Sequence, residues 1–231
     1  MEHDDAKPPR EKILQMLHEK SNLKQKVYDN TLEVFQMLKE CLHEFTNEVN
    51  EDLVGVDKRV RLEYRDRGQF EAEIRVAGDL LVFSMHTNIF DFDRSHKVRK
   101  LDLVQKDRLS SYCGVINIYN FLADSFKYNR TDDIGYLIGR IFVNKDHFFF
   151  VEGKRQHKYN VDSFGKQMLT EPILIEVVET AVRYALEFDL LSPPYEDVKE
   201  ATVSQINSKI GDSMVQTGKR LGFRFNADDV K

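Results

Sequence analysis

The hydrophobic period of this chain changes from helical to alternating near residue 59, and that change limits the folds open to it. Up to Asp57, apolar residues recur three or four positions apart, as they do on one face of a helix. From Arg59 onward, Val60, Leu62 and Tyr64 alternate with charged residues, which is typical of a strand with one wet face. The sequence therefore predicts a long helix followed by antiparallel strands.

The N-terminal helix is predicted to form a segment of its own, residues 1–58, before an α+β domain of residues 59–231. Ser21 can act as an N-cap, so the pattern allows either one long helix or a short helix leading into Asn22–Glu51, with a stop at Gly55. The apolar stripe must be buried, either against the sheet, which would make one compact domain, or against a second copy in a homodimer. Its members are Ile13, Leu17, Val27, Leu32, Phe35, Leu38, Leu42, Phe45 and Val49.

About six strands are predicted after this helix, in two meanders separated by a mixed connection over 87–111. Turn residues Asp66-Arg67-Gly68 and Gly78-Asp79 divide the first meander, and Asn144-Lys145-Asp146 is the expected turn of a later hairpin. The triplet Phe148-Phe149-Phe150 favours a strand covered on both faces. The expected spans are 59–65, 70–76, 80–86, 112–122, 135–143 and 147–151.

The C-terminal part returns to a helical period. Thr170 can cap a helix that Ser192-Pro193-Pro194 ends, and a last helix is predicted from about Tyr195 to Val215. The tail is expected to add a short edge strand or to dock on the core, through Leu221, Phe223 and Phe225. The predicted fold class is α+β, an antiparallel sheet with the long N-terminal helix and the C-terminal helices packed on one face or end.

This order of elements is similar to that of GAF and PAS type sensory domains and of profilin-like folds. The similarity is one of architecture and rests on no matching motif. The motifs of common enzymes are also missing, since the chain has no Gly-rich phosphate loop, Gly-x-Ser-x-Gly, His-Glu-x-x-His or Cys-x-x-Cys. The sequence therefore favours a soluble binding or regulatory module and leaves open whether the chain is an enzyme.

The charge and the cysteine content of the chain limit its expected partners and its expected compartment. The chain holds 39 acidic and 34 basic residues, a net charge of −5, so no chain-wide positive field favours nucleic acid as a partner. Cys41 and Cys113 are expected to be buried, reduced thiols in a cytoplasmic protein. Charged residues interrupt the longest apolar stretch, Ile173–Leu191, and the charged start has no apolar run after it. Neither a membrane span nor a signal peptide is expected.

The main site hypothesis concerns three polar residues within apolar strand patterns. Arg140 shares a strand face with Ile138 and Phe142, and Asn117 and Tyr119 share a face of another strand with apolar residues. Polar groups in such positions need partners. If both faces line one cavity, Arg140, Asn117 and Tyr119 would bind a small anionic ligand, and this hypothesis requires no metal or cofactor.

The alternative function hypothesis is a metal-dependent nuclease. It rests on Asp133, Glu152 and Lys154, which resemble the Asp…Glu-x-Lys core of restriction-like nucleases. The resemblance implies two carboxylates that hold Mg²⁺ or Mn²⁺ and a lysine that stabilises charge, so that the metal polarises a phosphate and activates water. This chain departs from the family in having no proline before the aspartate. A hairpin turn at 144–146 would also set Ile138 opposite Glu152 and leave Asp133 about five residues, or ~16 Å, out of register.

Three further features are candidate functional sites: a cluster of possible metal ligands, the surface of the N-terminal helix and a basic segment. His86, Asp91, Asp93 and His96 offer donors for zinc or manganese, at a spacing that matches no defined signature. The N-terminal helix would be the working surface of a structural or protein-interaction protein, the third function hypothesis. Residues 94–108 form a basic segment that faces either solvent or phosphates. Its cations are Arg94, Lys97, Arg99, Lys100, Lys106 and Arg108, and Lys154, Arg155 and Lys158 would extend it.

Overall fold

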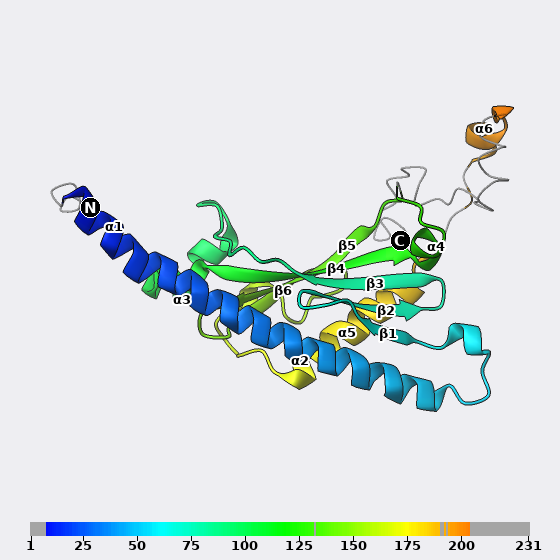
Figure 1. The fold of residues 1–231 in the computed structure, drawn as a ribbon, viewed down its shortest axis with the longest axis horizontal. Helices are drawn as coiled ribbons and strands as arrows, with labels where there is room; N and C mark the ends of the chain where they lie inside the picture. Colours follow the sequence, from blue (N-terminus) through cyan, green and yellow to red (C-terminus); the bar gives the residue numbers. More distant parts are fainter. Residues whose placement is uncertain (1–7, 132, 190–191, 193, 204–231) are drawn as a thin grey trace.

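The computed structural model describes residues 8–131, 133–189, 192 and 194–203, and it builds them around one sheet (Figure 1). The six strands lie in the order β1-β2-β3-β4-β5-β6, and each is antiparallel to its neighbours. The predicted α+β class is confirmed, and the two meanders join where β3 pairs with β4. The strands are β1 Glu63–Asp66, β2 Glu71–Val76, β3 Asp79–Met85, β4 Cys113–Leu122, β5 Tyr136–Asn144 and β6 Phe149–Gly153.

The N-terminal helix is continuous from Pro9 to Asp52. It consists of α1 Pro9–Met16, a π-helical turn Leu17–Ser21 and α2 Asn22–Asp52. The predicted N-cap at Ser21 is wrong, because Ser21 keeps helical angles, φ −73° and ψ −42°, and its side chain makes no cap hydrogen bond. The alternative of one long helix is the one observed. Gly55 follows the end of the helix with φ +89°, a conformation that favours glycine.

The remaining helices of the described residues are short, with one exception. The longer one, α5 Glu171–Leu186, ends before the predicted stop at Ser192-Pro193-Pro194, and Thr170 precedes it without a side-chain cap bond. Of the predicted last helix, α6 covers Tyr195–Val198, and the positions from 204 to 215 lie outside the described residues, as do Leu221, Phe223 and Phe225. The other helices are α3 Asp102–Lys106, α4 Ala123–Lys127 and 3-10 turns at Lys58–Val60, Lys97–Lys100, Arg108–Ser111 and Val161–Ser163.

Helices α2 and α5 cover the same face of the sheet, which we call the helical face (Figure 1). Side chains that point to this face from four strands are completely buried, namely Ile74, Phe83, Ile116 and Phe149. The stripe of α2 packs on them through Phe35, Leu38 and Leu42, which are also completely buried. The middle of the predicted stripe is therefore buried against the chain's own sheet.

The first turns of the helix extend past the sheet (Figure 1). No residue of α1 or of the π-helical turn is buried, and Leu23 is the first buried position of the helix. Lys20 lies over the ring of Tyr112, 5.7 Å from its centroid, where the helix reaches the body. Four apolar side chains before this point are 48–59% exposed, Ile13, Leu14, Met16 and Leu17. The predicted stripe positions Ile13 and Leu17 are therefore left more than half exposed among the described residues.

Two strand predictions need correction. The first strand begins at Glu63, because Asp57 caps a 3-10 turn at Lys58–Val60 by accepting from the Arg59 N–H. The later hairpin sets Arg140, not Ile138, opposite Glu152. Its loop is longer than predicted because the Asn144 side chain accepts from the backbone N–H groups of residues 146 and 148, at 2.9 and 3.0 Å.

Helix α2 crosses β4 at very close range. A Cβ built on Gly114 would lie 2.0 Å from Thr31 Oγ1 and 2.8 Å from Thr31 Cβ. Thr31 is completely buried, and its hydroxyl donates to the Val27 carbonyl at 2.6 Å. The crossing therefore requires the missing side chain of glycine.

We expect Gly114→Ala to lower the free energy of unfolding by about 1–3 kcal/mol, because the added methyl must push α2 off the sheet. Gly78→Ala is the matched control, since a Cβ there meets nothing within 4 Å. The control should change stability by less than about 0.5 kcal/mol. Urea unfolding measures both, and equal midpoints for the two variants would contradict the close crossing.

A buried lysine ties α2 to the β1–β2 turn. The Lys39 side chain is 8% exposed, and its Nζ donates to Asp66 Oδ1 at 2.8 Å and to the Gly68 carbonyl at 2.5 Å. The hydrogen bond from Lys39 holds the pKa of Asp66 below its ordinary value, with help from the Gly68 N–H. The ionised form of Asp66 is therefore favoured by folding.

Because the pKa of Asp66 is lowered in the folded state, its contribution to stability is complete above the ordinary carboxyl range. That contribution is lost as the pH falls through the lowered value. We expect Asp66→Asn to be less stable than wild type at pH 7, and the difference to shrink between about pH 5 and pH 2. Urea unfolding across this range measures the difference, with Asp52→Asn as the control. A difference that grows toward low pH would show that the assignment is wrong.

Candidate functional site

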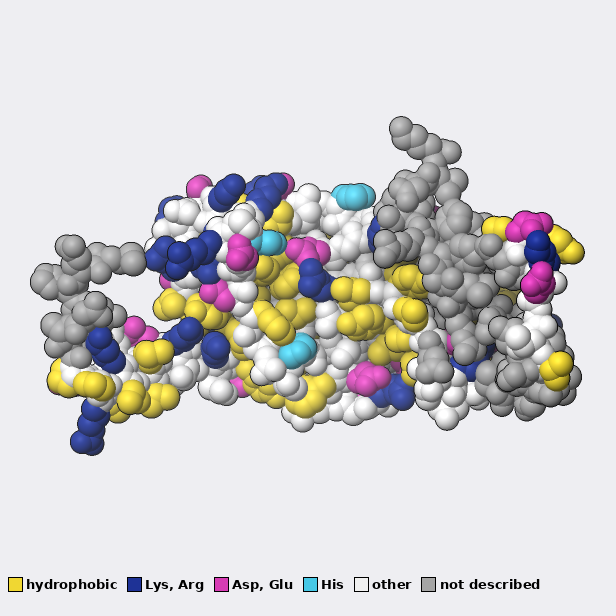
Figure 2. All heavy atoms as spheres, turned by 90° about the horizontal axis from the view of Figure 1, so that it is seen from above, with side chains coloured by type: hydrophobic (Ala, Val, Ile, Leu, Met, Phe, Trp, Pro, Cys, Tyr) yellow, Lys and Arg dark blue, Asp and Glu magenta, His cyan; other side chains and the backbone are white. Residues whose placement is uncertain are grey.

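The second face of the sheet, which we call the open face, has described residues packed over both of its ends. At one end Phe92, from the connection between β3 and β4, packs on Phe142 and Phe150, with centroids 5.3 and 5.7 Å apart. At the other end Phe126 of α4 meets Phe121 edge to face, 5.2 Å between centroids. Figure 2 shows the molecule from above, with hydrophobic side chains across the middle and Lys and Arg gathered toward the left.

A row of polar residues crosses the open face through five strands. The register sets Glu71 opposite Ser84, Ser84 opposite Asn117, Asn117 opposite Arg140, and Arg140 opposite Glu152. All five are partly buried. The neighbouring rows are largely apolar, with Val115, Phe142 and Phe150 on one side and Val82, Tyr119 and Leu137 on the other. Polar groups in such surroundings need partners, from the protein or from a ligand.

Arg140 is the central charge of this row. Its Nη2 donates to Glu152 Oε2 at 2.5 Å, and its guanidinium lies 5.2 Å from the centroid of the Phe142 ring. The side chains of Arg140 and Glu152 are 43% and 32% exposed, so the pair adds no more than ~1 kcal/mol to stability. Among the described residues Arg140 has no second carboxylate, which leaves guanidinium N–H groups available to a ligand.

His96 brings the connection between β3 and β4 to the same row. Its Nε2 lies 3.7 Å from Glu152 Oε1, and its ring stacks on Phe92 with centroids 4.7 Å apart. Its Nδ1 accepts from the Val98 N–H at 3.3 Å. The proton of the neutral ring is therefore on Nε2, the nitrogen that faces Glu152.

The structure brings the three predicted ligand residues onto one face. Asn117 is directly opposite Arg140, and Tyr119 lies on the same face of β4, where a register shift after Ile118 sets it opposite Leu137. The Arg140 side chain is 43% exposed, and Asn117 and Tyr119 are partly buried. Their role in binding stays a prediction.

The two carboxylates of the nuclease hypothesis lie in separate clusters. Asp133, whose side chain is 5% exposed, accepts from Ser125 Oγ at 2.7 Å and lies 3.3 Å from Arg130 Nε. Glu152 is held by Arg140 and His96, as described above. Lys154 follows β6, and its backbone N–H donates to the Ile138 carbonyl.

The donors of the predicted metal cluster are also held in local contacts. Asp91 accepts from Arg99 and Ser111 at 2.6 and 2.7 Å. Asp93 accepts from Ser95 twice, and these hydrogen bonds lower the pKa of its carboxyl. His86 Nδ1 accepts from the backbone N–H of residue 88. Within the described part of the chain, no three His, Cys, Asp or Glu side chains gather where they could hold a metal ion.

The basic segment divides into paired and unpaired cations. Lys97 is paired with Asp162, at 2.6 Å, and Arg99 is paired with Asp91. The predicted extensions are also paired, since Arg155 contacts Glu187 and Lys158 contacts Glu176. No ion pair is formed by Arg94, Lys100, Lys106 or Arg108 with any described residue.

The two cysteines are buried thiols with no disulfide between them, as predicted. Burial raises the pKa of the Cys41 thiol to about 11, and Glu171 adds to the effect. Burial also raises the pKa of Cys113. Both groups are therefore protonated near neutral pH and are poor nucleophiles.

The chain was compared with protein families, curated proteins and solved structures. No family model, curated protein or solved structure matches the chain. None of the described helices combines the length and the apolar character needed to cross a membrane.

Proposed function

We propose that this chain is a binding module whose open sheet face takes a small organic anion. The observation that carries the proposal is the register that sets Asn117 opposite Arg140 within a row of partly buried polar residues. A guanidinium binds a carboxylate through two parallel N–H donors, and the Asn117 amide adds a third. Tyr119 and Leu137 lie in the next row, so a carboxylate on a flat apolar group fits this surface best.

Glu152 would couple ligand binding at this site to the connection between β3 and β4. It already accepts from Arg140, so a ligand carboxylate competes with it for the same guanidinium. Release of Glu152 would leave its carboxylate to His96 alone, on the connection that covers one end of the open face. Ligand binding is thereby coupled to the position of residues 87–112.

The setting that fits this proposal is the cytoplasm. Cys41 and Cys113 are both free thiols, and a reducing compartment keeps them so. The nuclease alternative is the weaker one, because it needs Asp133 and Glu152 at one metal ion, and their carboxylates are engaged in different ion pairs.

The test is a titration with benzoate, followed by amide shifts in ¹H–¹⁵N spectra of the full chain. We expect saturable shifts around Arg140, Asn117 and Tyr119, and about tenfold weaker binding for Arg140→Gln, because a hydrogen bond to a charged group is lost. Glu152→Gln should strengthen binding, since it removes the competing carboxylate.

Arg108→Gln is the matched control, an exposed arginine away from the polar row, and it should bind benzoate as wild type does. The proposal fails if the shifts do not saturate, if Arg140→Gln and Arg108→Gln behave alike, or if Glu152→Gln weakens binding.

A second function, self-association, is favoured by exposed apolar side chains of α1 and of the π-helical turn that follows it. Ile13, Leu14 and Leu17 continue the stripe that the sheet buries on α2, and nothing described covers them. Residues 10–20 carry both signs of charge, Arg10, Lys12 and Lys20 beside Glu11 and Glu19, so a second copy of the same helix is not repelled. We propose that two copies pair through this end of the helix, as the homodimer hypothesis predicts.

We expect the wild-type chain to be a dimer by light scattering at concentrations of about 0.1 mM, and Leu14→Glu/Leu17→Glu to be a monomer, because the charges cannot be buried. Val54→Glu/Val203→Glu is the control, since both residues are exposed apolar positions outside this helix, and it should remain a dimer. A monomeric wild type, or two double variants with the same mass, would refute the pairing.

A further inference from the structure

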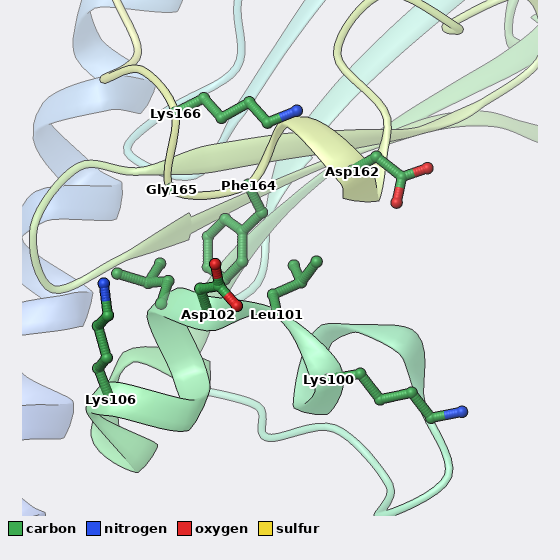
Figure 3. Close-up of a pocket in the computed structure, with 9 residues that line it drawn as sticks. Lys100, Leu101, Asp102, Lys106, Asp162, Phe164, Gly165 and Lys166 are labelled. Carbon is green, nitrogen blue, oxygen red and sulfur yellow. The ribbon is translucent and has the colours of Figure 1, made fainter.

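A hollow of about 470 Å³ lies between the segment 100–106 and the turn at 162–166 (Figure 3). Its volume is within the range of small-molecule sites. It is built by residues distinct from Arg140, Asn117 and Tyr119, and it is lined by Lys100, Leu101, Asp102, Leu103, Lys106, Asp162, Phe164, Gly165 and Lys166.

Apolar side chains form the floor of this hollow. Leu101 and Leu103 are partly buried, and the Phe164 ring is buried among them. Gly165 lets the two walls approach, because its φ is +89° and a Cβ there would lie 3.0 Å from Leu103 Cδ2. The floor therefore offers a surface against which a flat apolar group can pack.

The charges around the floor are mostly positive and unpaired. Lys106 and Lys166 lie on two sides of the Phe164 ring, and Lys100 extends outward (Figure 3). None of the three forms an ion pair with a described residue. Asp162 is paired with Lys97, at 2.6 Å, whereas Asp102 forms no ion pair with any described residue.

We propose that this hollow binds a nucleoside monophosphate, at a site separate from that of the proposed function. Lysine ammonium groups suit a phosphate dianion, since they act as point charges with freely rotating donors. The Asp102 carboxylate repels a bare anion and accepts hydrogen bonds from sugar hydroxyls. The base packs on Leu101 and Leu103. A ligand with phosphate, hydroxyls and a flat ring satisfies all three parts of the lining, and a hollow of about 470 Å³ suits it better than a polymer strand.

The test is calorimetric titration of the full chain with adenosine 5′-monophosphate, adenosine and inorganic phosphate. We expect saturable binding of the monophosphate, with adenosine and inorganic phosphate each at least about tenfold weaker. The double variant Lys106→Gln/Lys166→Gln should bind the monophosphate about tenfold more weakly than wild type does. The matched control is Lys58→Gln/Lys127→Gln, which removes the same charge at two exposed lysines elsewhere and should leave binding unchanged.

The proposal is overturned if binding of the monophosphate does not saturate, or if both double variants weaken that binding equally. It is overturned as well if inorganic phosphate binds as tightly as the monophosphate. It is also overturned if a single-stranded oligonucleotide binds more tightly, with a steep fall in affinity as salt rises, because the lysines would then belong to a nucleic-acid surface. Arg140→Gln should bind the monophosphate as wild type does, so failure of one site does not decide the other.

Discussion

Burial of the α2 stripe against the sheet fixes which side of every strand faces inward. Successive side chains of a strand point to opposite faces, so the register that buries Phe83 and Ile116 also turns Ser84 and Asn117 outward. The polar row on the open face is therefore a direct result of how the helical face packs. A slip of one residue in any strand would bury a member of that row and expose a core side chain.

The helix is fastened to the sheet by polar contacts as well as by its stripe. The buried Asn30 amide donates to the carbonyls of Asn144 and Lys145, at 3.2 and 2.9 Å, and so holds α2 to the β5–β6 loop. Lys39 makes the corresponding contact with the β1–β2 turn. Together with the close crossing of Thr31 over Gly114, these contacts fix the middle of the helix, since each requires one particular position of α2.

Periodicity predicted the parts of this structure that repeat, and it failed where single side chains decide. Alternation gave the strands and their faces, so Arg140, Asn117 and Tyr119 could be grouped before the structure was known. The partner of Arg140 could not be predicted, because the hairpin register depends on backbone hydrogen bonds to the Asn144 side chain. The contact between His96 and Glu152 was also missed, since residues 87–111 have no period and fold through short local caps.

All strand pairings join neighbours in sequence, but α2 depends on residues that are made much later. Asn30 contacts Asn144, 114 positions further along the chain, and α5 completes the helical face later still. On the ribosome α2 emerges before the sheet, and its apolar stripe remains in water until most of the sheet has been synthesised. In the nascent chain, the residues that later form the core are therefore the ones most open to chaperone binding and to aggregation.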